Sequence, residues 1–408
     1  MPNKDRNIPK RRFKEFENAD AWELRPLGEI GNTYTGLSGK TKDDFGHGDG
    51  RFVTYMNVFS NPISLPEMVE AVEIDESQNT VRYGDVLFTT SSETPEEVGM
   101  SSVWLENTEN TYLNSFCFGF RPVKKVNPYY LAYLLRSSGM RRKISFLAQG
   151  ISRYNISKTK MMELKISIPN ENEQEVIGTF FSTLDRHITL HQRKLDKLKS
   201  VKQAYLSEMF PAEGERVPKR RFPGFTDDWE LRKLGEVGTV AMCRRIFKEQ
   251  TSEHGEIPFY KIGTFGGTPD AFIARELFEE FKDKYSYPNI GDILISASGS
   301  IGRTVEFLGE DEYFQDSNIV WLKHDGKINN IFLKQFYSIV KWSGIEGSTI
   351  KRLYNENILN TEISLPTLPE QKAIGSFFST LDRQITLHQR KLEKLKNLKK
   401  ALLNELFV

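Results

Sequence analysis

The 408-residue sequence has only two cysteines, Cys117 and Cys243, and six histidines, and their scatter matches no metal-ligand spacing. Two thiols exclude a disulfide-stapled secreted scaffold and fit a reducing compartment. No apolar run approaches the roughly 20 residues that a membrane helix needs. Met1–Arg12 is polar and basic and lacks the apolar segment of a signal peptide. We therefore expect a cytoplasmic protein with no membrane contact.

An excess of charge of one sign is also missing, because 56 Lys and Arg face 55 Asp and Glu. A net charge near zero argues neither for nor against binding to nucleic acid. The positions of the charges are therefore more informative than their sum. A hydrophobic content of 38% with 27% charged residues is typical of a folded protein. The length favours two domains of ordinary size over one core.

Catalytic signatures are absent as well. Asn127-Pro128-Tyr129-Tyr130 resembles the Asn-Pro-Pro-Tyr loop of adenine methyltransferases, but it lacks the second proline and opens a predicted helix. The glycines of Ser298–Gly302 precede no Lys-Ser or Lys-Thr pair, so a tight turn is favoured over a phosphate loop. We predict that this chain has no catalytic residue, no metal and no cofactor of its own.

One long segment occurs twice. Residues 177–199 read IGTFFSTLDRHITLHQRKLDKLK, and residues 374–396 read IGSFFSTLDRQITLHQRKLEKLK. The copies differ only at Thr179/Ser376, His187/Gln384 and Asp196/Glu393. Chance does not produce such identity, so the chain is a tandem duplication.

The duplication extends beyond these segments. Ile8–Phe13 (IPKRRF) recurs as Val217–Phe222 (VPKRRF), and residues 150–169 match the pattern of residues 347–366 at the same offset. Between the shared opening and the shared segment, the halves have diverged until only scattered anchors correspond. We interpret the chain as a constant scaffold that carries two different recognition domains.

Short β-branched and aromatic runs, separated by Gly, Asn, Asp and Pro, fill the diverged regions. They predict strands at Arg51–Val58, Asp85–Thr90, Phe116–Val123 and Asp292–Ser296. Asn127-Pro128 predicts the cap and first turn of a helix, with Asn329–Val340 as its counterpart. We expect an α+β fold with two globular, β-rich domains of mostly antiparallel sheet.

Two long helices are predicted from the repeated segments. Asn170-x-x-Glu173 and Thr367-x-x-Glu370 have capping-box form just before an apolar heptad pattern begins. Helices of about 35 residues, about 50 Å long, should pair as an antiparallel coiled coil about a pseudo-two-fold axis. The expected interface residues are Phe181, Leu184, Ile188, His191, Leu195 and Leu198, with Phe378, Leu381, Ile385, His388, Leu392 and Leu395. We expect His191 and His388 near that axis, as polar residues that set the register.

Over its whole length the sequence resembles the specificity subunits of type I restriction-modification systems. The resemblance rests on the Pro-x-x-Pro-Glu-Gln motif at 366–371, the Phe-Phe-Ser-Thr-Leu-Asp helices, and the opening RFPGFTDDWE at 221–230. The opening of the first half departs from this last motif by two residues in length. The resemblance implies a target-recognition domain at 1–168, a spacer helix at 169–211, a second target-recognition domain at 212–365 and a second spacer helix at 366–408.

The same resemblance implies a non-catalytic, DNA-binding subunit that reads an asymmetric, bipartite site in double-stranded DNA, one half per domain. It implies docking of two methyltransferase subunits, which a restriction and translocase subunit can join. S-adenosylmethionine and ATP with Mg²⁺ would belong to those partners. Because the helices would separate the domains by about one DNA turn, about 34 Å, we expect helix length to set the non-specific spacer.

Base readout needs donors and acceptors on loops that enter a groove. In the first domain the candidate DNA contacts are Thr35, Ser38, Lys40, Lys42, Tyr55, Asn57, Ser91, Ser92, Arg153 and Tyr154. In the second they are Arg244, Arg245, Lys248, Tyr260, Lys261, Ser298, Ser300, Arg303, Lys351 and Arg352. The basic helix faces, Lys10–Arg12 and Lys219–Arg221 are either phosphate contacts or ordinary solvated charges.

Two other functions remain open at this point. The chain could be a coiled-coil scaffold that joins protein partners without DNA specificity, and salt-dependent binding to a bipartite site over a scrambled control separates that function from DNA reading. It could also be a self-sufficient methyltransferase or nuclease. Binding of S-adenosylmethionine by the purified chain alone tests the latter.

Overall fold

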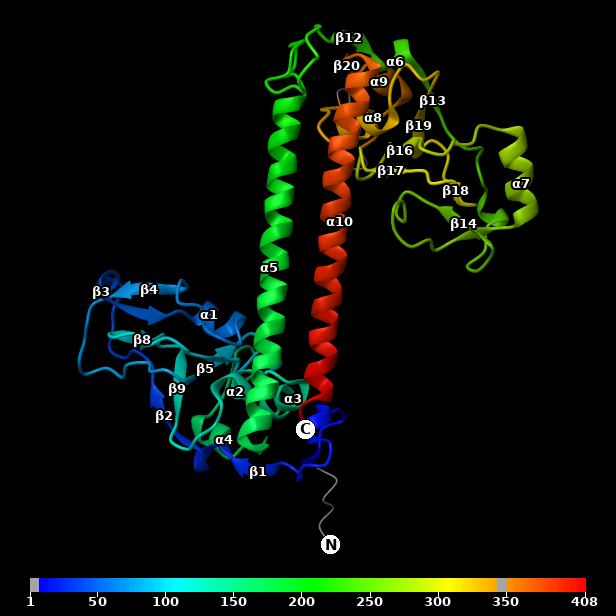
Figure 1. Ribbon diagram of the computed structural model, residues 1–408. Coiled ribbons are helices and arrows are strands. Elements are labelled where there is room, and N and C mark those ends of the chain that lie inside the picture. Colours follow the sequence, from blue (N-terminus) through cyan, green and yellow to red (C-terminus); the bar gives the residue numbers. More distant parts are fainter. Residues whose placement is uncertain (1–6, 343–350) are drawn as a thin grey trace. The chain divides into compact units, whose positions relative to one another are not determined.

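The structure, a computed structural model, describes residues 7–342 and 351–408. The chain divides into two compact units. Unit 1 comprises Met1–Gln192 with Arg390–Val408, and unit 2 comprises Arg193–Gln389. Residues 1–6 and 343–350, which belong to the predicted recognition domains, lie outside the described residues. Figure 1 shows short strands and helices in each unit, beside parts of the two long helices α5 (Glu171–Met209) and α10 (Leu368–Glu405).

The main sheet of unit 1 has four strands in the order β2-β9-β5-β7, each antiparallel to its neighbour. A second sheet has the order β4-β3-β8, in which β3 and β8 are parallel. Two-stranded pairs β1-β11 and β6-β10 complete the strands. Their bounds are β1 Glu23–Pro26, β2 Gly31–Thr35, β3 Phe45–Val53, β4 Val69–Val72, β5 Val86–Thr89, β6 Ser91–Ser92, β7 Ser101–Val103, β8 Thr111–Leu113, β9 Cys117–Pro122, β10 Tyr154–Asn155 and β11 Lys165–Ile168.

The helices of unit 1 are α1 Tyr55–Ser60, α2 Pro128–Leu134, α3 Ser138–Ser145, α4 Lys158–Met162 and the first part of α5 Glu171–Met209. Side chains cap α1, α2 and α3, whereas α4 has no side-chain cap. Asn127 caps α2 as predicted, because its side chain accepts a hydrogen bond from the Tyr130 amide at 3.1 Å. The predicted strand Arg51–Val58 is wrong in its second half. The strand ends at Val53, and Thr54 caps α1 by accepting from the Asn57 amide.

Unit 2 has the same sheet topology although its sequence has diverged. The orders β13-β19-β16-β17, β15-β14-β18 and β12-β20 repeat the three corresponding sheets of unit 1, including one parallel pair, β14 and β18. The strands are β12 Glu230–Lys233, β13 Gly238–Ala241, β14 Ile257–Tyr260, β15 Phe272–Ile273, β16 Ile293–Ser296, β17 Thr304–Glu306, β18 Tyr313–Phe314, β19 Ile319–His324 and β20 Glu362–Leu365. The helices are α6 Leu234–Val237, α7 Arg275–Lys284, α8 Asn330–Tyr337, α9 Asn355–Asn360 and α10 Leu368–Glu405.

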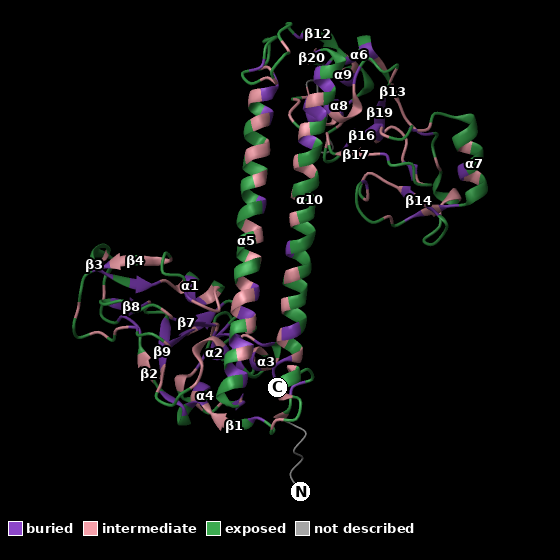
Figure 2. Ribbon diagram, in the orientation of Figure 1, coloured by how far each residue is buried: buried purple, intermediate pink, exposed green. Residues whose placement is uncertain are grey.

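The hydrophobic core of each unit includes residues from both long helices. In unit 1 the core includes Ile177 and Phe181 of α5 and Leu402 of α10, with Leu406 and Phe407 directly after α10. In unit 2 the core includes Leu206 and Met209 of α5 and Ile374 and Phe378 of α10, with Phe210 directly after α5. Burying a side chain of this size contributes about 1.5–3 kcal/mol, so each helix end is held by its domain core. Figure 2 shows buried stretches in purple on both long helices.

The two long helices run in opposite directions within each unit, as predicted. In unit 1 the rings of Phe181 and Phe407 stack at 5.6 Å, and Lys399 forms an ion pair with Asp185 at 2.5 Å. Unit 2 repeats this ion pair at 2.6 Å between Lys202 and Asp382. The packing is therefore antiparallel in both units, with equivalent contacts.

The predicted interface residues differ in burial. Phe181, Leu184, Leu195, Phe378 and Leu392 are buried. The residues Ile188, His191, Leu198, Leu381, Ile385, His388 and Leu395 are half-buried. Phe181 and Phe378 pack within the domain cores, because they lie near the start of their helices, where the domain covers the helix.

The capping boxes take a different form from the one that the sequence predicts. Asn170 accepts from the Glu173 amide at 2.9 Å, but the Glu173 carboxylate binds Arg12. Gln174 accepts from the Asn127 amide at 2.9 Å and so ties α5 to the start of α2. The repeated Glu-Gln pair thus anchors the first turn of each long helix to its domain. Gln371 accepts from the Asn329 amide in the same way at 2.8 Å.

Candidate nucleic-acid interface

Three neighbouring strands of unit 1 bring several predicted DNA contacts to one end of the main sheet. In the register of β2, β9 and β5, Thr35 is paired with Phe118, and Phe118 with Phe88. Because the strands are antiparallel, the C-terminal ends of β2 and β5 lie beside the N-terminal end of β9. The residues that follow β5 and precede β9 therefore share this sheet end with Thr35.

The β6-β10 pair places the segment around Arg153 at the same sheet end. Tyr154 pairs with Ser92, Asn155 pairs with Ser91, and the Ile156 amide donates to the Thr90 carbonyl at 3.0 Å. The Tyr55 hydroxyl donates to the Ser91 carbonyl at 2.8 Å. Five of the predicted contacts thus come together although they are far apart in the sequence. They are Tyr55, Ser91, Ser92, Arg153 and Tyr154.

These five residues are not equally accessible. Ser91 and Ser92 are buried at 5% and 8% exposure, whereas Arg153 is exposed and Tyr154 half-buried. Burial raises the pKa of the Tyr55 hydroxyl, which therefore stays protonated and able to donate. Among these five, the most accessible side chains are those of β10 and its loop.

Asn57 is placed differently, in the first turn of α1. It is fully buried, its Nδ2 donates to the carbonyls of Leu65 and Met68 at 2.8 and 3.0 Å, and its Oδ1 accepts from the Leu65 amide. The amide group therefore holds the turn that follows α1. We leave Asn57 out of the candidate interface.

The remaining predictions of the first domain lie on the loop after β2. The Ser38 amide donates to Gln78 Oε1 at 3.1 Å, and Lys40 forms an ion pair with Asp75 at 2.9 Å. Lys42 is exposed in a short 3-10 helix. This loop starts at the sheet end, but its contacts lead towards residues 75–78.

Unit 2 presents basic side chains at the corresponding end of its main sheet. The register of β13, β19, β16 and β17 brings together the residues after Ala241 and Ser296 with those before Ile319 and Thr304. Ser298 forms a β-bridge with Arg352, which corresponds to the β6-β10 pair of unit 1. The predicted contacts at this end are Arg244, Arg245, Ser298, Ser300, Arg303, Lys351 and Arg352.

Specific contacts fix the direction of the arginines at this end. Arg245 pairs with Asp316 at 2.9 Å. Arg303 donates from Nη2 to the Ile262 carbonyl at 2.8 Å, and its guanidinium lies 5.6 Å from the centre of the Phe265 ring. Both arginines remain exposed, so donors stay available to a ligand.

The serines and the remaining predictions of unit 2 have mixed roles. Ser298 is buried and donates to Asn318 Oδ1 at 2.7 Å, while the Ser300 carbonyl accepts from the Ser296 hydroxyl. Tyr260 stacks on Phe314, and its burial raises the pKa of its hydroxyl. At the sheet end, Arg244 lies over the Tyr285 ring. Two lysines lie further out: Lys261 paired with Asp270, and Lys248 exposed in a 3-10 helix.

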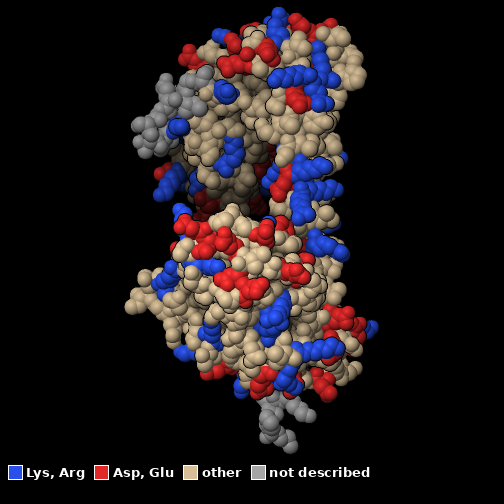
Figure 3. All heavy atoms as spheres, turned by 90° about the vertical axis from the view of Figure 1, so that its left-hand side faces the viewer, with Lys and Arg blue, Asp and Glu red and all other residues tan. Residues whose placement is uncertain are grey.

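The two sheet ends differ in charge. At the end of unit 2, Arg245 pairs with Asp316, and Arg303 and Arg352 add positive charge, whereas β6 of unit 1 is followed by Glu93, Glu96 and Glu97. Figure 3 shows both signs of charge on the face that it presents. Similar folds thus present unlike surfaces at equivalent sheet ends.

Sequence reasoning missed one exposed aromatic residue at the first sheet end. Phe116 is 54% exposed, its carbonyl accepts from the Thr90 amide and hydroxyl, and Arg153 lies 5.8 Å over its ring. Its only signal in the sequence is a place at the start of a predicted strand, which indicates burial.

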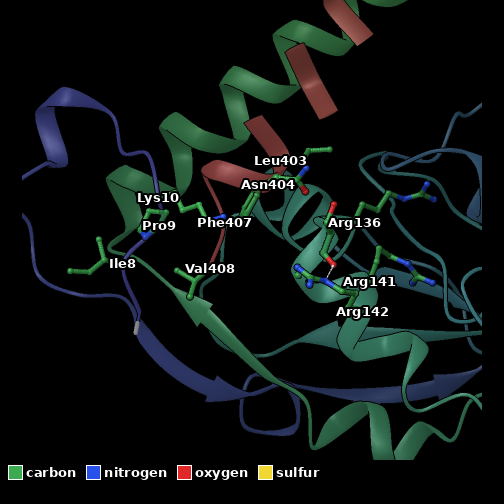
Figure 4. A pocket seen from close by; sticks show the side chains of 12 residues that line it. Ile8, Pro9, Lys10, Arg136, Arg141, Arg142, Leu403, Asn404, Phe407 and Val408 are labelled. Atoms are coloured by element: carbon green, nitrogen blue, oxygen red, sulfur yellow. Dashed lines mark hydrogen bonds between the residues drawn. The ribbon is translucent and has the colours of Figure 1, made fainter. Parts of the chain in front are cut away.

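A hollow of about 800 Å³ in unit 1 is not an arginine-lined anion site, although three arginines border it. Arg136 donates to four backbone carbonyls, and Arg141 to three. Burial lowers the pKa of Arg136 to about 9 and that of Arg141 to about 10. Figure 4 shows both side chains extending away from Lys10 and Val408. Only Arg142 is an exposed cation among the three.

Neither of the two cysteines, Cys117 and Cys243, is an activated thiol, because both are buried. Burial raises the pKa of the Cys117 thiol and raises that of Cys243 to about 12. Within residues 7–342 and 351–408, no cluster of three His, Cys, Asp or Glu side chains could hold a metal ion. No helix in that part of the chain is long and apolar enough to cross a membrane.

Two stretches of the chain, residues 19–200 and 226–397, match the family described as "Type I restriction modification DNA specificity domain". A putative type I restriction enzyme specificity subunit of Haemophilus influenzae is 59% identical over 158 residues, which cover 38% of this chain and 41% of that protein. A putative type I restriction enzyme specificity subunit of Methanocaldococcus jannaschii is 24% identical and covers 98% of this chain and 96% of its own length.

Solved structures share the fold. The crystal structure of the type I restriction-modification S subunit from M. genitalium has a TM-score of 0.65 at 15% identity, covering 98% of this chain and 99% of that one. A chain from a structure that concerns complex assembly and conformational transition of the type I restriction-modification system has a TM-score of 0.51 at 19% identity, covering 95% and 97%. Both family matches cover most of one repeat each, and together they span well over half of the chain. The chain therefore belongs to the type I restriction-modification DNA specificity family and is one of its non-catalytic specificity subunits.

Proposed function

We propose that this subunit reads an asymmetric, bipartite DNA site, with one half-site for each recognition domain. One observation carries the proposal: equivalent sheets in the two units present different side chains at the same end. A symmetric pair of identical domains reads a palindrome, so two domains with unlike reading surfaces read two unlike half-sites. The readers are residues 1–168 and 212–365, and the spacer helices are 169–211 and 366–408.

In the second domain, Arg303 is the best placed side chain for base readout. Its orientation is fixed by the Ile262 carbonyl and the Phe265 ring, while it stays exposed. An arginine held in this way can donate two hydrogen bonds to guanine O6 and N7, which contributes about 1–3 kcal/mol of discrimination.

The test uses the complete complex with its methyltransferase partner. Arg303→Ala should lower affinity for the cognate site about 10-fold to 100-fold and relax the second half-site only. Arg275→Ala on α7 is the matched control, because Arg275 is also exposed and pairs with Glu256 and Asp311 away from the sheet end. Binding without any preference for a split sequence would instead favour a protein-joining scaffold.

We also propose that two methyltransferase subunits dock on a surface that the long helices repeat. Leu190 and Leu387 occupy the same position in the two copies, and each is 62% exposed. Arg186 and Arg383, one turn earlier, are exposed in both copies. A single exposed leucine is ordinary, but an identical apolar and basic surface in both repeats fits one partner that binds twice.

Stoichiometry tests this docking. Leu190→Asp and Leu387→Asp should each remove one methyltransferase copy from the complex, and the double variant should remove both, as measured by native mass spectrometry. Ser200→Asp is the control, because it adds the same charge at an exposed position where the repeats differ. Single variants that retain both copies contradict the proposal.

The length of the helices, 39 residues in α5 and 38 in α10, is proposed to set the spacer between the half-sites. Adding a few residues within Leu195–Lys202 should lengthen the spacer in the methylated motif and leave both half-sites unchanged. Changed half-sites at constant spacing would contradict the proposal that helix length sets the spacer.

We propose that restriction and translocase subunits bind to this methyltransferase complex. The full complex acts in the cytoplasm. S-adenosylmethionine and ATP with Mg²⁺ are assigned to the partner subunits. This chain supplies sequence recognition and the docking surfaces.

A further inference from the structure

The segment between α3 and β10 forms a defined hairpin at the sheet end of unit 1. The Gln149 amide donates to the Asn155 carbonyl at 2.9 Å, and the Asn155 amide donates to the Gln149 carbonyl at 2.8 Å. Gly150 has φ +136, and a Cβ there would lie 2.1 Å from the Arg153 carbonyl oxygen. The turn therefore requires glycine at this position.

This hairpin is fixed to the sheet end through its second strand. Asn155 pairs with Ser91 in β6, and the next residue, Ile156, donates its amide to the Thr90 carbonyl. The tip of the hairpin consequently projects from the surface at which the predicted DNA contacts Tyr55, Arg153 and Tyr154 gather.

The tip carries an exposed apolar side chain beside a cation. Ile151 is 95% exposed, the highest value among the exposed large hydrophobic residues that the structure describes. Arg153, two residues later, lies over the Phe116 ring at 5.8 Å. No carboxylate forms an ion pair with Arg153 in the described part of the chain. An apolar group and an available guanidinium thus lie on one short, defined turn.

The DNA major groove offers partners for both groups. Thymine presents its C5-methyl group there, and guanine presents the acceptors O6 and N7. Isoleucine has no hydrogen-bond donor and gains from contact with a methyl group, whereas arginine donates to acceptors or phosphates.

We propose that the 149–155 hairpin enters the major groove of the first half-site, where Ile151 packs against a thymine methyl group and Arg153 donates to a neighbouring acceptor. This inference rests on the proposed function of unit 1 as a DNA reader. It makes Ile151 a specificity-determining residue for the first half-site.

The second repeat does not share this side chain. At the common offset, Gly150 corresponds to Gly347 and Ile151 to Ser348, which lies outside the described residues. A thymine contact by Ile151 therefore concerns one half-site only, and the other half-site serves as an internal control.

The decisive experiment removes the Ile151 side chain and the thymine methyl group, first separately and then together. With the complete methyltransferase complex, we measure binding to the mapped site and to the same site with each thymine of the first half replaced by deoxyuridine, which lacks only the methyl group. At one position the wild-type complex should lose about fourfold in affinity, the value of one buried methyl group of about 0.8 kcal/mol. Ile151→Ala should bind both DNAs equally.

Control variants separate this contact from a folding defect. Ser152→Ala changes the adjacent exposed residue of the tip and should keep the full response to deoxyuridine. Deoxyuridine in the second half-site should affect wild type and Ile151→Ala equally.

Three results would overturn the inference. They are a first half-site without thymine, an Ile151→Ala variant that keeps the deoxyuridine response, or a variant that loses affinity on every sequence, as a wedge between base steps would. In the first two cases the bipartite readout itself can stand. A complex with no preference for any split sequence would refute the proposed function as well, so the two failures are distinguishable.

Discussion

Arg12 and Glu173 form a bidentate ion pair, with Arg12 Nε and Nη2 at 2.7 and 2.6 Å from the two carboxylate oxygens. The side chains are 6% and 0% exposed. Arg221 and Glu370 repeat this pair in unit 2 with side chains 13% and 0% exposed. In each unit the preceding arginine pairs with the last turns of the other long helix. These second pairs are Arg11 with Glu405, and Arg220 with Glu208.

The repeated basic opening is thus a clamp on the two long helices of each unit. The hydrogen bonds to Glu173 raise the pKa of Arg12, so the guanidinium stays charged. Neither of the sequence-based alternatives, a phosphate contact or a solvated tail, applies to Arg12 or Arg221. Both side chains form ion pairs within the protein.

Removing one partner of this buried pair should destabilise unit 1. Arg12→Ala leaves the Glu173 carboxylate buried without a counter-charge, which costs about 3–5 kcal/mol. We expect faster hydrogen exchange in the first turns of α5 and in β1, measured by mass spectrometry. The double variant Arg12→Met, Glu173→Met should recover most of the protection, because apolar side chains of similar volume replace the pair.

The matched variant Arg221→Ala should produce the same effect at the first turns of α10 and leave those of α5 unchanged. Equal protection in Arg12→Ala and wild type would show that the pair does not hold α5.

Two equivalent glycines should respond differently to alanine. A Cβ at Gly178 would lie 2.7 Å from Tyr129 Cβ and 2.9 Å from the Tyr130 nitrogen. At Gly375 the nearest atom, the Phe332 nitrogen, is 3.1 Å away. Gly178→Ala should therefore cost about 1–3 kcal/mol through overpacking against α2. Gly375→Ala should stay within about 1 kcal/mol of wild type, because the helix propensity of alanine offsets its smaller clash.

Urea unfolding of the two alanine variants measures this difference, and hydrogen exchange in α2 and α8 assigns it to a unit. If Gly375→Ala is the more destabilised variant, the close approach of α2 to α5 is not the cause.

Asn57→Ala should affect folding and not DNA specificity. The substitution leaves the Leu65 and Met68 carbonyls and the Leu65 amide without their buried partners, at about 1–3 kcal/mol for each unsatisfied group. Thermal unfolding should show a lower midpoint, with the methylated motif unchanged. Ser60→Ala, at an exposed position of α1, should leave both unchanged. A changed motif at unchanged stability would restore Asn57 to the reading surface.

Local signals in the sequence were sufficient for the elements that depend on neighbouring residues. Asn127-Pro128 predicts the start of α2, and the heptad pattern predicts both long helices, because caps and apolar periodicity act within a few residues. The same locality explains the errors. Thr54 is β-branched, as strand residues often are, but it caps α1. The local sequence fits both a strand residue and a helix cap, and only the path of the chain in the folded unit selects the cap.

Contacts between distant residues could not be predicted in this way. Glu173 fits a capping box locally, but its partner Arg12 is 161 residues away. Polar loop residues likewise divide into buried ones such as Asn57 and exposed ones such as Arg303 only after the sheets form. Selecting polar residues also excludes Ile151 and Phe116 from the start, although both are exposed at the sheet end.

The stability of unit 2 should fall between pH 5 and pH 8 because of Glu312, which precedes β18. Burial and the nearby charge of Glu310 raise the pKa of Glu312 from 4.5 to about 7. The folded state therefore binds the proton more tightly than the unfolded chain, so the stabilisation is fully present below pH 4.5 and is lost as the pH rises through 7. Glu312→Gln removes this titration and should flatten the decline in unfolding midpoint over that range. Glu310→Gln should only reduce the decline, since burial remains, and an equal slope in Glu312→Gln and wild type would assign the pH dependence to another group.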